Sequence, residues 1–196
     1  MSGYGSSTTS EGKELTADGR APQLTGERVV GNELVSFDFA KDKETGDAIT
    51  SRAELKFKQS NGAIVNIVFF DSTEGWAIDR TNAQLLHVFS KIVTKEEYYA
   101  AIGKPANFQE FVERIKTKIV PKAAGKTFTC KFVYIISKSS GRANIGFPNF
   151  PNFFELDGTN PSTLSTNTKY DVYIKPWSPE VAANATTTTD DTEVPF

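Results

Sequence analysis

The sequence predicts a single domain that is mainly β, with a helical segment inserted between the early and the late strands. Apolar and polar residues alternate in strand fashion before residue 71 and again after residue 126. Apolar residues at helical spacing fill much of the stretch between them. The chain has 196 residues, 38% of them hydrophobic and 23% charged. That is enough for one packed core and too little for two large domains.

The first three strands are predicted from alternation and from one turn signal. Residues 29–39 contain two apolar runs typical of a strand. Residues 52–58 alternate between apolar and charged side chains, which indicates a half-exposed strand. Asn61-Gly62 is a strong hairpin signal. Residues 64–70 are therefore expected to form the more buried partner strand.

Two helices are expected next. Apolar residues recur at helical spacing within residues 85–93 and again within residues 108–119, and Pro121 ends the second run. Capping patterns favour helix starts at two places. They are Thr94 with Glu97, and Asn107 with Glu110.

Strand patterning returns at residues 127–136 and at residues 170–175, with an aromatic and proline-rich segment at residues 146–154 between them. Three strands, helices, and then two or three strands is the order of an OB-fold-like five-stranded barrel with helices between strands 3 and 4. An antiparallel β-sandwich with a helical insert is the competing architecture.

The two ends of the chain differ from its middle. Residues 1–28 lack apolar periodicity, which predicts a flexible N-terminal arm. Residues 179–196 contain a threonine run followed by acidic residues, which predicts a flexible acidic tail. The folded domain is therefore expected at residues 29–178.

The formal net charge of −2 hides an uneven distribution. The arm carries three basic and four acidic residues, and the tail carries four acidic residues and no basic one. The domain between them has 19 basic and 16 acidic residues and is mildly basic. The near-neutral total therefore does not argue against a nucleic-acid partner.

Scarce residue types exclude several kinds of chemistry. The chain has one cysteine, Cys130, and one histidine, His87, so the sequence predicts neither an internal disulfide nor a zinc cluster. Nucleotide-binding and calcium-binding motifs are not found. We therefore expect a protein without cofactor or metal that is not an enzyme. No apolar run is long enough to span a membrane, which predicts a soluble, cytoplasmic protein.

The stretch from Arg114 to Phe154 contains eight cations and no acidic residue, and aromatic residues are interleaved with them. Cations neutralise phosphates, and aromatic faces stack on unpaired bases of any sequence. Single-stranded DNA is therefore the expected partner. The candidate contacts in this stretch are Lys116, Lys118, Lys122, Lys126, Lys131, Tyr134, Lys138, Arg142, Phe147, Phe150 and Phe153.

Other interpretations of these residues stay open. Each aromatic residue could belong to the core, and Lys116 and Lys118 could form a solvated helix face. In an OB fold, strands 2 and 3 form the usual binding face, which adds three candidates. They are Arg52, Lys56 and Lys58. Trp76 follows a turn between sheet and helix, and we expect it to cap the core.

The last residues of the chain resemble the C-terminal tip of bacterial single-stranded DNA-binding proteins, in which acidic residues precede Pro and a terminal Phe. The matching residues are Asp190, Asp191, Glu193, Val194, Pro195 and Phe196. The domain looks more like that of single-stranded DNA-binding proteins encoded by bacteriophages. The resemblance implies a tip that docks on replication, recombination or repair proteins such as a polymerase, helicase, primase or recombinase.

The sequence thus predicts a non-catalytic protein that coats single-stranded DNA and recruits partners through its tail, in an infected bacterial cell if the protein is viral. The rival interpretation is a virion structural or attachment protein with a β-sandwich fold. Threonine-rich ends and a mid-chain aromatic cluster suit that class as well.

Overall fold

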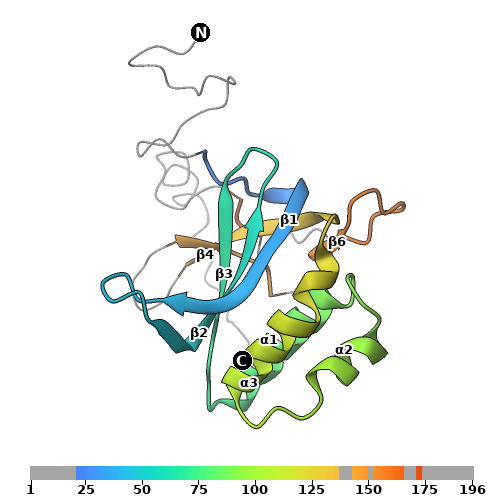
Figure 1. Cartoon of the computed structure of the whole chain (residues 1–196). Coiled ribbons are helices and arrows are strands. Elements are labelled where there is room, and N and C mark those ends of the chain that lie inside the picture. Colours follow the sequence, from blue (N-terminus) through green and yellow to red (C-terminus); the bar gives the residue numbers. More distant parts are fainter. Residues whose placement is uncertain (1–20, 137–142, 150–151, 166–170, 174–196) are drawn as a thin grey trace, which may run out of the picture.

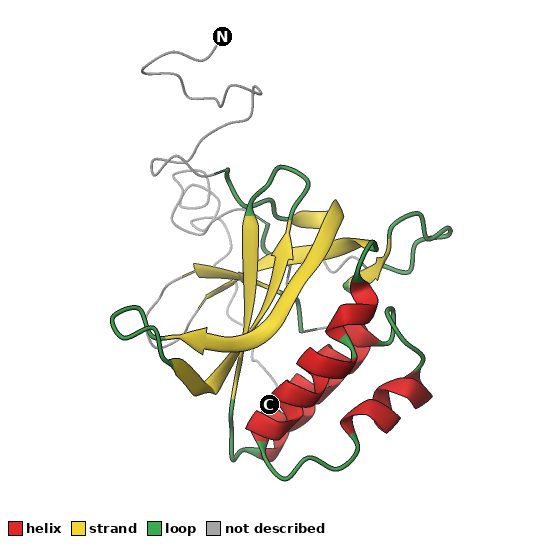
Figure 2. Ribbon diagram, in the orientation of Figure 1, coloured by secondary structure: helices red, strands yellow, loops and turns green. Residues whose placement is uncertain are grey.

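The computed structural model describes residues 21–136, 143–149, 152–165 and 171–173 (Figure 1). In these residues, a six-stranded antiparallel sheet is joined by three α-helices that gather at one end of it (Figure 2). In chain order, the elements are β1 (Gly26–Lys41), β2 (Ala48–Lys58), β3 (Ile64–Phe70), α1 (Gly75–Phe89), α2 (Lys95–Ile102), α3 (Phe108–Lys118), a short 3-10 helix (Val120–Ala123), β4 (Thr127–Ile136), β5 (Ala143–Gly146) and β6 (Phe154–Leu156).

The sheet has the strand order β3-β2-β1-β4-β5, and β6 pairs with β4 beside this path. β1 is the central strand, and it pairs with β4 through its first half and with β2 through its second half. The register shifts twice in each of these pairings. Such irregularities bend a strand and increase its twist. β1 therefore sweeps from one half of the sheet to the other, as Figure 1 shows.

The prediction of a mainly β protein with helices between the third and fourth strands is confirmed. The sheet is open, because no hydrogen-bonded pairing joins β3 to β5 among the described residues. A closed barrel is therefore not observed. The described strands form one sheet, whereas a β-sandwich has two.

The core lies between the inner face of the sheet and the helices. Phe57 on β2 is fully buried, and its ring lies 5.8–6.0 Å from the rings of three other phenylalanines. Those rings belong to Phe132 on β4, Phe154 on β6 and Phe147, which follows β5. Val112 and Ile115 of α3 are also fully buried. The aromatic contacts thus connect strands that are far apart in the sequence.

The helix starts follow the capping signals. Thr94 and Glu97 form a complete capping box at α2. Asn107 caps α3 by accepting a hydrogen bond from the backbone N–H of Glu110 at 2.9 Å. The Glu110 carboxylate instead accepts from the backbone N–H of Ala106 at 2.7 Å, so the box at α3 is incomplete.

The fold begins earlier than the predicted boundary at residue 28. β1 starts at Gly26, and the Asn61 side chain donates a hydrogen bond to the carbonyl of Pro22 at 2.6 Å. Leu24 exchanges two hydrogen bonds with the buried Gln59 side chain. Residues 22–28 therefore belong to the folded unit. The hairpin between β2 and β3 that anchors them is confirmed at Asn61-Gly62.

The last predicted strand lies partly outside the described residues. The described part, residues 171–173, has no strand assignment, but the carbonyl of Val172 accepts a hydrogen bond from the backbone N–H of Tyr134 at 2.7 Å. The carbonyl of Tyr173 accepts from the Thr25 hydroxyl at 2.7 Å. This segment therefore runs beside β4 and the start of β1.

His87 packs inside the fold, with its ring 4.6 Å from that of Phe153. Burial and the nearby Lys91 ammonium lower its pKa to about 4. Its Nε2 atom is buried without a hydrogen-bond partner among the described residues. The neutral imidazole is therefore the form that the native state accommodates.

This predicts a loss of stability in mild acid. The unfolded chain binds a proton at His87 near pH 6.5, whereas the folded chain binds it only near pH 4, so acidification favours unfolding. Between pH 7 and pH 5 we expect His87 to account for a loss of about 2 kcal/mol in the free energy of unfolding. Urea unfolding at both pH values measures it. The His87→Leu variant should lack the part of this loss that His87 causes. An equal pH dependence of the free energy of unfolding in the variant and the wild-type protein would contradict the prediction.

Candidate functional site

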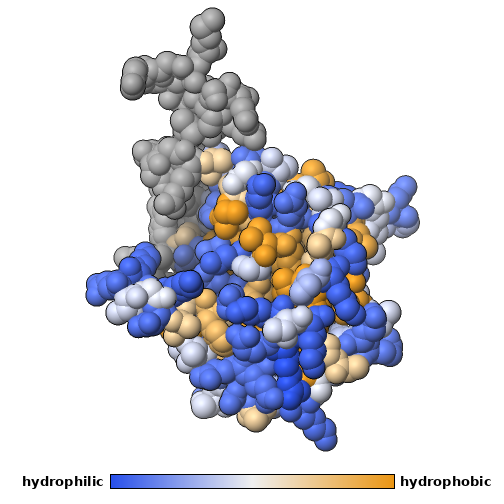
Figure 3. All heavy atoms as spheres, viewed as in Figure 1, coloured by the Kyte–Doolittle hydropathy of each residue, from blue (hydrophilic) through white to orange (hydrophobic). Residues whose placement is uncertain are grey.

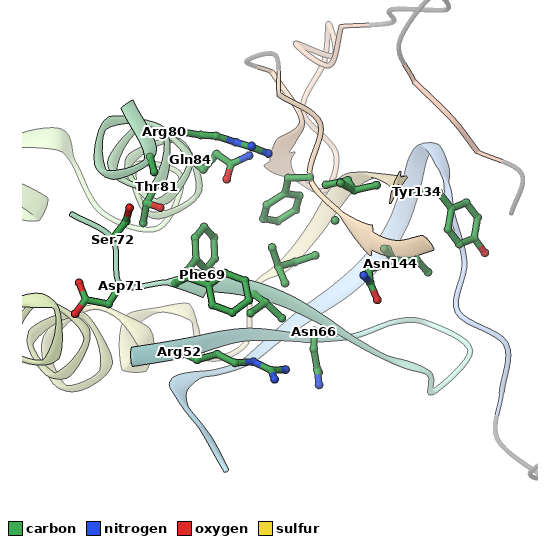
Figure 4. A pocket seen from close by; sticks show the side chains of 18 of the residues that line it. Arg52, Asn66, Phe69, Asp71, Ser72, Arg80, Thr81, Gln84, Tyr134 and Asn144 are labelled. Carbon is green, nitrogen blue, oxygen red and sulfur yellow. The ribbon is translucent and has the colours of Figure 1, made fainter. Parts of the chain in front are cut away.

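A cleft of about 930 Å³ opens where β3 and β5 fail to join. One wall is α1, the opposite wall is formed by β4 and β5, and β2 and β3 complete the lining. Figure 4 shows polar side chains from all these elements around it. They are Arg52 and Asn66 from β2 and β3, Arg80 and Gln84 from α1, and Tyr134 and Asn144 from β4 and β5.

Two large aromatic side chains of the cleft are exposed to solvent. Phe70, at the end of β3, is 62% exposed, and Trp76, in the first turn of α1, is 69% exposed. β3 alternates, so Phe69 points into the core at the base of the cleft while Phe70 points outward. Full burial of such a ring would stabilise the fold by about 1.5–3 kcal/mol, and each exposed ring lacks this stabilisation. Exposed aromatic residues beside a cleft are a feature of binding sites.

The charged side chains that line the described cleft are Arg52, Arg80 and Asp71, so the lining is mildly basic. Arg52 lies opposite Phe70 in the pairing of β2 with β3. Arg80 is exposed, one turn along α1 from Trp76. Lys56 and Lys58 extend the cationic row along the outer face of β2, opposite Asn66 and Ile64.

The surface outside the cleft is mixed. On the face that Figure 3 shows, hydrophilic side chains dominate over the helices, and apolar ones reach the surface over the sheet. Val30 and Val35 on β1 are both more than half exposed. A second hollow of about 600 Å³ lies among the three helices and shares Phe70 and Asp71 with the cleft. Its lining combines apolar residues with Asp71, Asn82 and Asn107, and among the described residues no lysine or arginine contributes to it.

The cleft combines two arginines with two exposed aromatic rings. Arginines bind phosphate through several donors at once, and exposed aromatic rings offer faces for stacking. In the described part of the chain, no three His, Cys, Asp or Glu side chains gather as metal ligands would. The Cys130 thiol is fully buried, and burial raises its pKa. Burial of that kind does not favour a reactive thiolate.

The structure brings together five of the predicted site residues. Arg52, Tyr134 and Phe147 line the cleft, and Lys56 and Lys58 lie on the adjoining outer face of β2. These residues lie around one cleft because of the strand order. β2 lies next to β3 on one side of the cleft, and the bend of the sheet brings β4 to the other side.

Phe147, Phe153 and Lys131 were predicted as DNA contacts, and their burial corrects this. Phe147 and Phe153 are 1% and 2% exposed and stack on each other at 4.5 Å in the core. Lys131 is 1% exposed and forms a buried ion pair with Asp171, and it also donates to the carbonyl of Ser165. The three side chains therefore stabilise the fold, although Phe147 also contributes to the lining of the cleft.

Four further described lysines of the acid-free stretch do not line the cleft, so their assignment as DNA contacts stays a prediction. Lys116 and Lys122 pair with Asp38 and Glu97 at 2.9 Å and 3.4 Å. Lys118 and Lys126 donate to backbone carbonyls at 3.1 Å and 2.9 Å. Lys116 also lies 3.5 Å from Glu113 of its own helix, so both distant and neighbouring carboxylates partner these cations.

Several predicted residues lie outside the described part of the chain. They are Lys138, Arg142 and Phe150, and the tip residues Asp190, Asp191, Glu193, Val194, Pro195 and Phe196.

The sequence analysis missed Phe70 and Arg80, and it expected Trp76 to cap the core, whereas Trp76 is 69% exposed. A signal for Trp76 is present: it precedes the buried Leu85 by nine residues. At 3.6 residues per turn, that interval puts the two side chains on opposite faces of α1. Phe70 is the outward neighbour of an inward Phe69 in a strand, which alternation also indicates.

No protein-family model, curated protein or solved structure matches the chain. Within the described residues, no helix is both long and apolar enough to cross a membrane.

The buried pair predicts that Lys131→Ala destabilises the fold. Removing one partner leaves the Asp171 carboxylate buried without this cation, which costs about 3–5 kcal/mol in the free energy of unfolding. Chemical denaturation measures the loss. Lys58→Ala is the matched control, because Lys58 is exposed on the same kind of strand and its removal should cost less than about 0.5 kcal/mol. Equal stability of the two variants would contradict the assignment.

Proposed function

We propose that this protein binds single-stranded DNA without catalysis and coats and protects it during replication or recombination. One observation carries the proposal: exposed Phe70 and Trp76 lie with Arg52 and Arg80 along a single cleft. Stacking on the two rings provides affinity that tolerates any base, and the arginines neutralise phosphates.

The polar residues of the cleft suit the same ligand. Asn66, Gln84 and Asn144 carry amide groups that donate and accept hydrogen bonds. Unpaired bases expose edges that need such partners, whereas the bases of a duplex have satisfied each other. A strand with its bases turned toward the cleft would place its phosphates at the basic rim.

The topology also supports the proposal. In an OB fold the first strand pairs with the second and the fourth, and helical structure separates the third strand from the fourth. β1, β2, β3 and β4 follow this pattern, and β5 ends on the far side of the cleft from β3. We therefore propose that the domain is a variant of the OB fold whose sheet is open between β3 and β5. Arg52, Lys56 and Lys58 then lie on the strand face that OB folds use for oligonucleotides.

The loop between β4 and β5 adds a supporting feature from the sequence. Residues 137–142 connect these strands and include Lys138 and Arg142. In OB folds this connection is one of the loops that contact nucleic acid. Its composition is that expected of a strand-binding loop.

Trp76→Ala should weaken binding to single-stranded DNA by about 5- to 150-fold. This fold-change corresponds to the about 1–3 kcal/mol that one stacked base contributes to the binding free energy. Titration with fluorescently labelled oligo-dT measures it. In a Trp177→Phe background, Trp76 is the remaining tryptophan of the chain, and oligo-dT should quench its fluorescence. The quenching should be lost steeply as salt rises.

Ile78→Ala is the matched control, because Ile78 is an exposed apolar residue of α1 outside the lining of the cleft. It should leave the affinity unchanged. Equal affinity of the wild-type protein for single-stranded and duplex DNA would overturn the stacking model, and so would full binding by Trp76→Ala.

The acidic tip is proposed to recruit replication or recombination proteins, with Phe196 as the apolar anchor and Asp190, Asp191 and Glu193 as the charged flank. Aromatic anchors concentrate binding energy in a small contact. A tail of this kind also competes with DNA for the cations of the domain.

Deleting residues 187–196 should therefore raise the affinity for oligo-dT several-fold at low salt and change it little at high salt. The variant with Asp190→Asn, Asp191→Asn and Glu193→Gln separates charge from length and should behave like the deletion. Unchanged affinity of both variants at low salt would remove the competition from the proposal. Binding of a labelled tip peptide to a purified polymerase or helicase, and its loss in Phe196→Ala, tests recruitment.

A further inference from the structure

Glu54 lies between the cations that border the cleft. It is on the outer face of β2 with only 9% of its surface exposed. Its Oε1 atom accepts a hydrogen bond from Arg52 Nη2 at 2.7 Å. Its Oε2 atom lies 3.4 Å from Lys56 Nζ and accepts from Asn66 Nδ2 at 3.5 Å. One carboxylate thus engages three side chains, two of which line the cleft.

These three partners are donors of the kind that a phosphate requires. A guanidinium, an ammonium and an amide all bind anionic oxygens, and a carboxylate presents such oxygens in much the same way as a phosphate. Arg52 and Lys56 remain more than one-third exposed, so an incoming strand can reach them. A phosphate that binds either cation must then compete with Glu54.

Glu54 also lies opposite another acid in the sheet. The pairing of β1 with β2 places Asp38 directly across from it. Like charges in this position are unfavourable. Asp38 is engaged by Lys116 of α3 at 2.9 Å, whereas Glu54 pairs with Arg52 and Lys56. Partly exposed ion pairs add little to stability, whereas one full negative charge here changes the field of the cleft.

We infer that Glu54 sets the strength and the salt dependence of DNA binding, because its carboxylate occupies Arg52 and Lys56 in the free protein and gives them up to phosphates. This inference rests on the proposed function. Arg52, Lys56 and Glu54 together carry a net charge of +1. Removing the charge of Glu54 raises this net charge to +2.

Glu54→Gln keeps the shape and one acceptor oxygen of the side chain and removes its charge. We expect it to bind oligo-dT about fourfold more tightly at low salt, the effect of one unit charge at about 5 Å in water. The slope of the logarithm of the binding constant against the logarithm of the salt concentration should become steeper by about 0.7. One additional phosphate contact on a single strand contributes this amount to the slope. Titrations at about 50 and 200 mM salt measure both quantities.

Glu96→Gln on α2 is the matched control, because it removes the same charge from an exposed residue outside the cleft. It should leave the slope unchanged. Glu54→Thr is a second variant for the case that Glu54→Gln folds poorly. It removes the same negative charge, and threonine is favoured in β-strands. Thermal unfolding confirms that each variant is folded.

Weaker binding by both Glu54 variants would overturn the inference, since it would mean that the carboxylate positions Arg52 for the strand. Unchanged affinity and slope would overturn it as well. In either case, a loss of binding in Trp76→Ala would leave the proposed function standing. If the wild-type protein does not bind oligo-dT, both the inference and the proposed function fail.

Discussion

The fold depends on the bend of one long strand. β1 must pair with β4 through its first half and with β2 through its second half, and a straight strand would keep these neighbours in one flat sheet. Shifts of register accommodate the bend. Gly31, with a φ of +71°, allows β1 to pass close to Ser60, whose Cβ would lie 3.2 Å from an added side chain. The halves of the sheet therefore face each other, with β3 and β5 on the two sides of the cleft.

As a result of this bend, some aromatic residues are buried in the core and others are exposed at the cleft. Facing halves of the sheet bring Phe57 against Phe132, Phe147 and Phe154, and this cluster fills the space that the curved sheet encloses. Phe70 and Trp76 lie at the edge of that space and stay in contact with solvent. The same geometry that closes the core thus leaves two aromatic rings exposed at the opening of the cleft.

Charges are divided in a similar way. The lysines that follow one another between residues 116 and 131 pair in space with Asp38, Glu97 and Asp171 or with backbone carbonyls. The basic character of the cleft comes instead from Arg52 and Arg80, which are 28 positions apart in the sequence. Asp71 and Glu54 moderate it. A charge count along the chain therefore says little about the potential at the site.

The sequence by itself determined that three strands precede the helices and that β4 follows them, and it determined the hairpin at Asn61-Gly62 and the capping box at Thr94. Each of these depends on residues within a few positions of one another. It also placed Arg52, Lys56 and Lys58 on one face of a strand. Only the tertiary structure decided that Phe147 and Lys131 are buried. Their environments are set by partners far away in the chain. Lys131 meets Asp171 40 positions later, and Phe147 meets Phe57 90 positions earlier. Local patterns carry no information on which distant partner will cover a side chain.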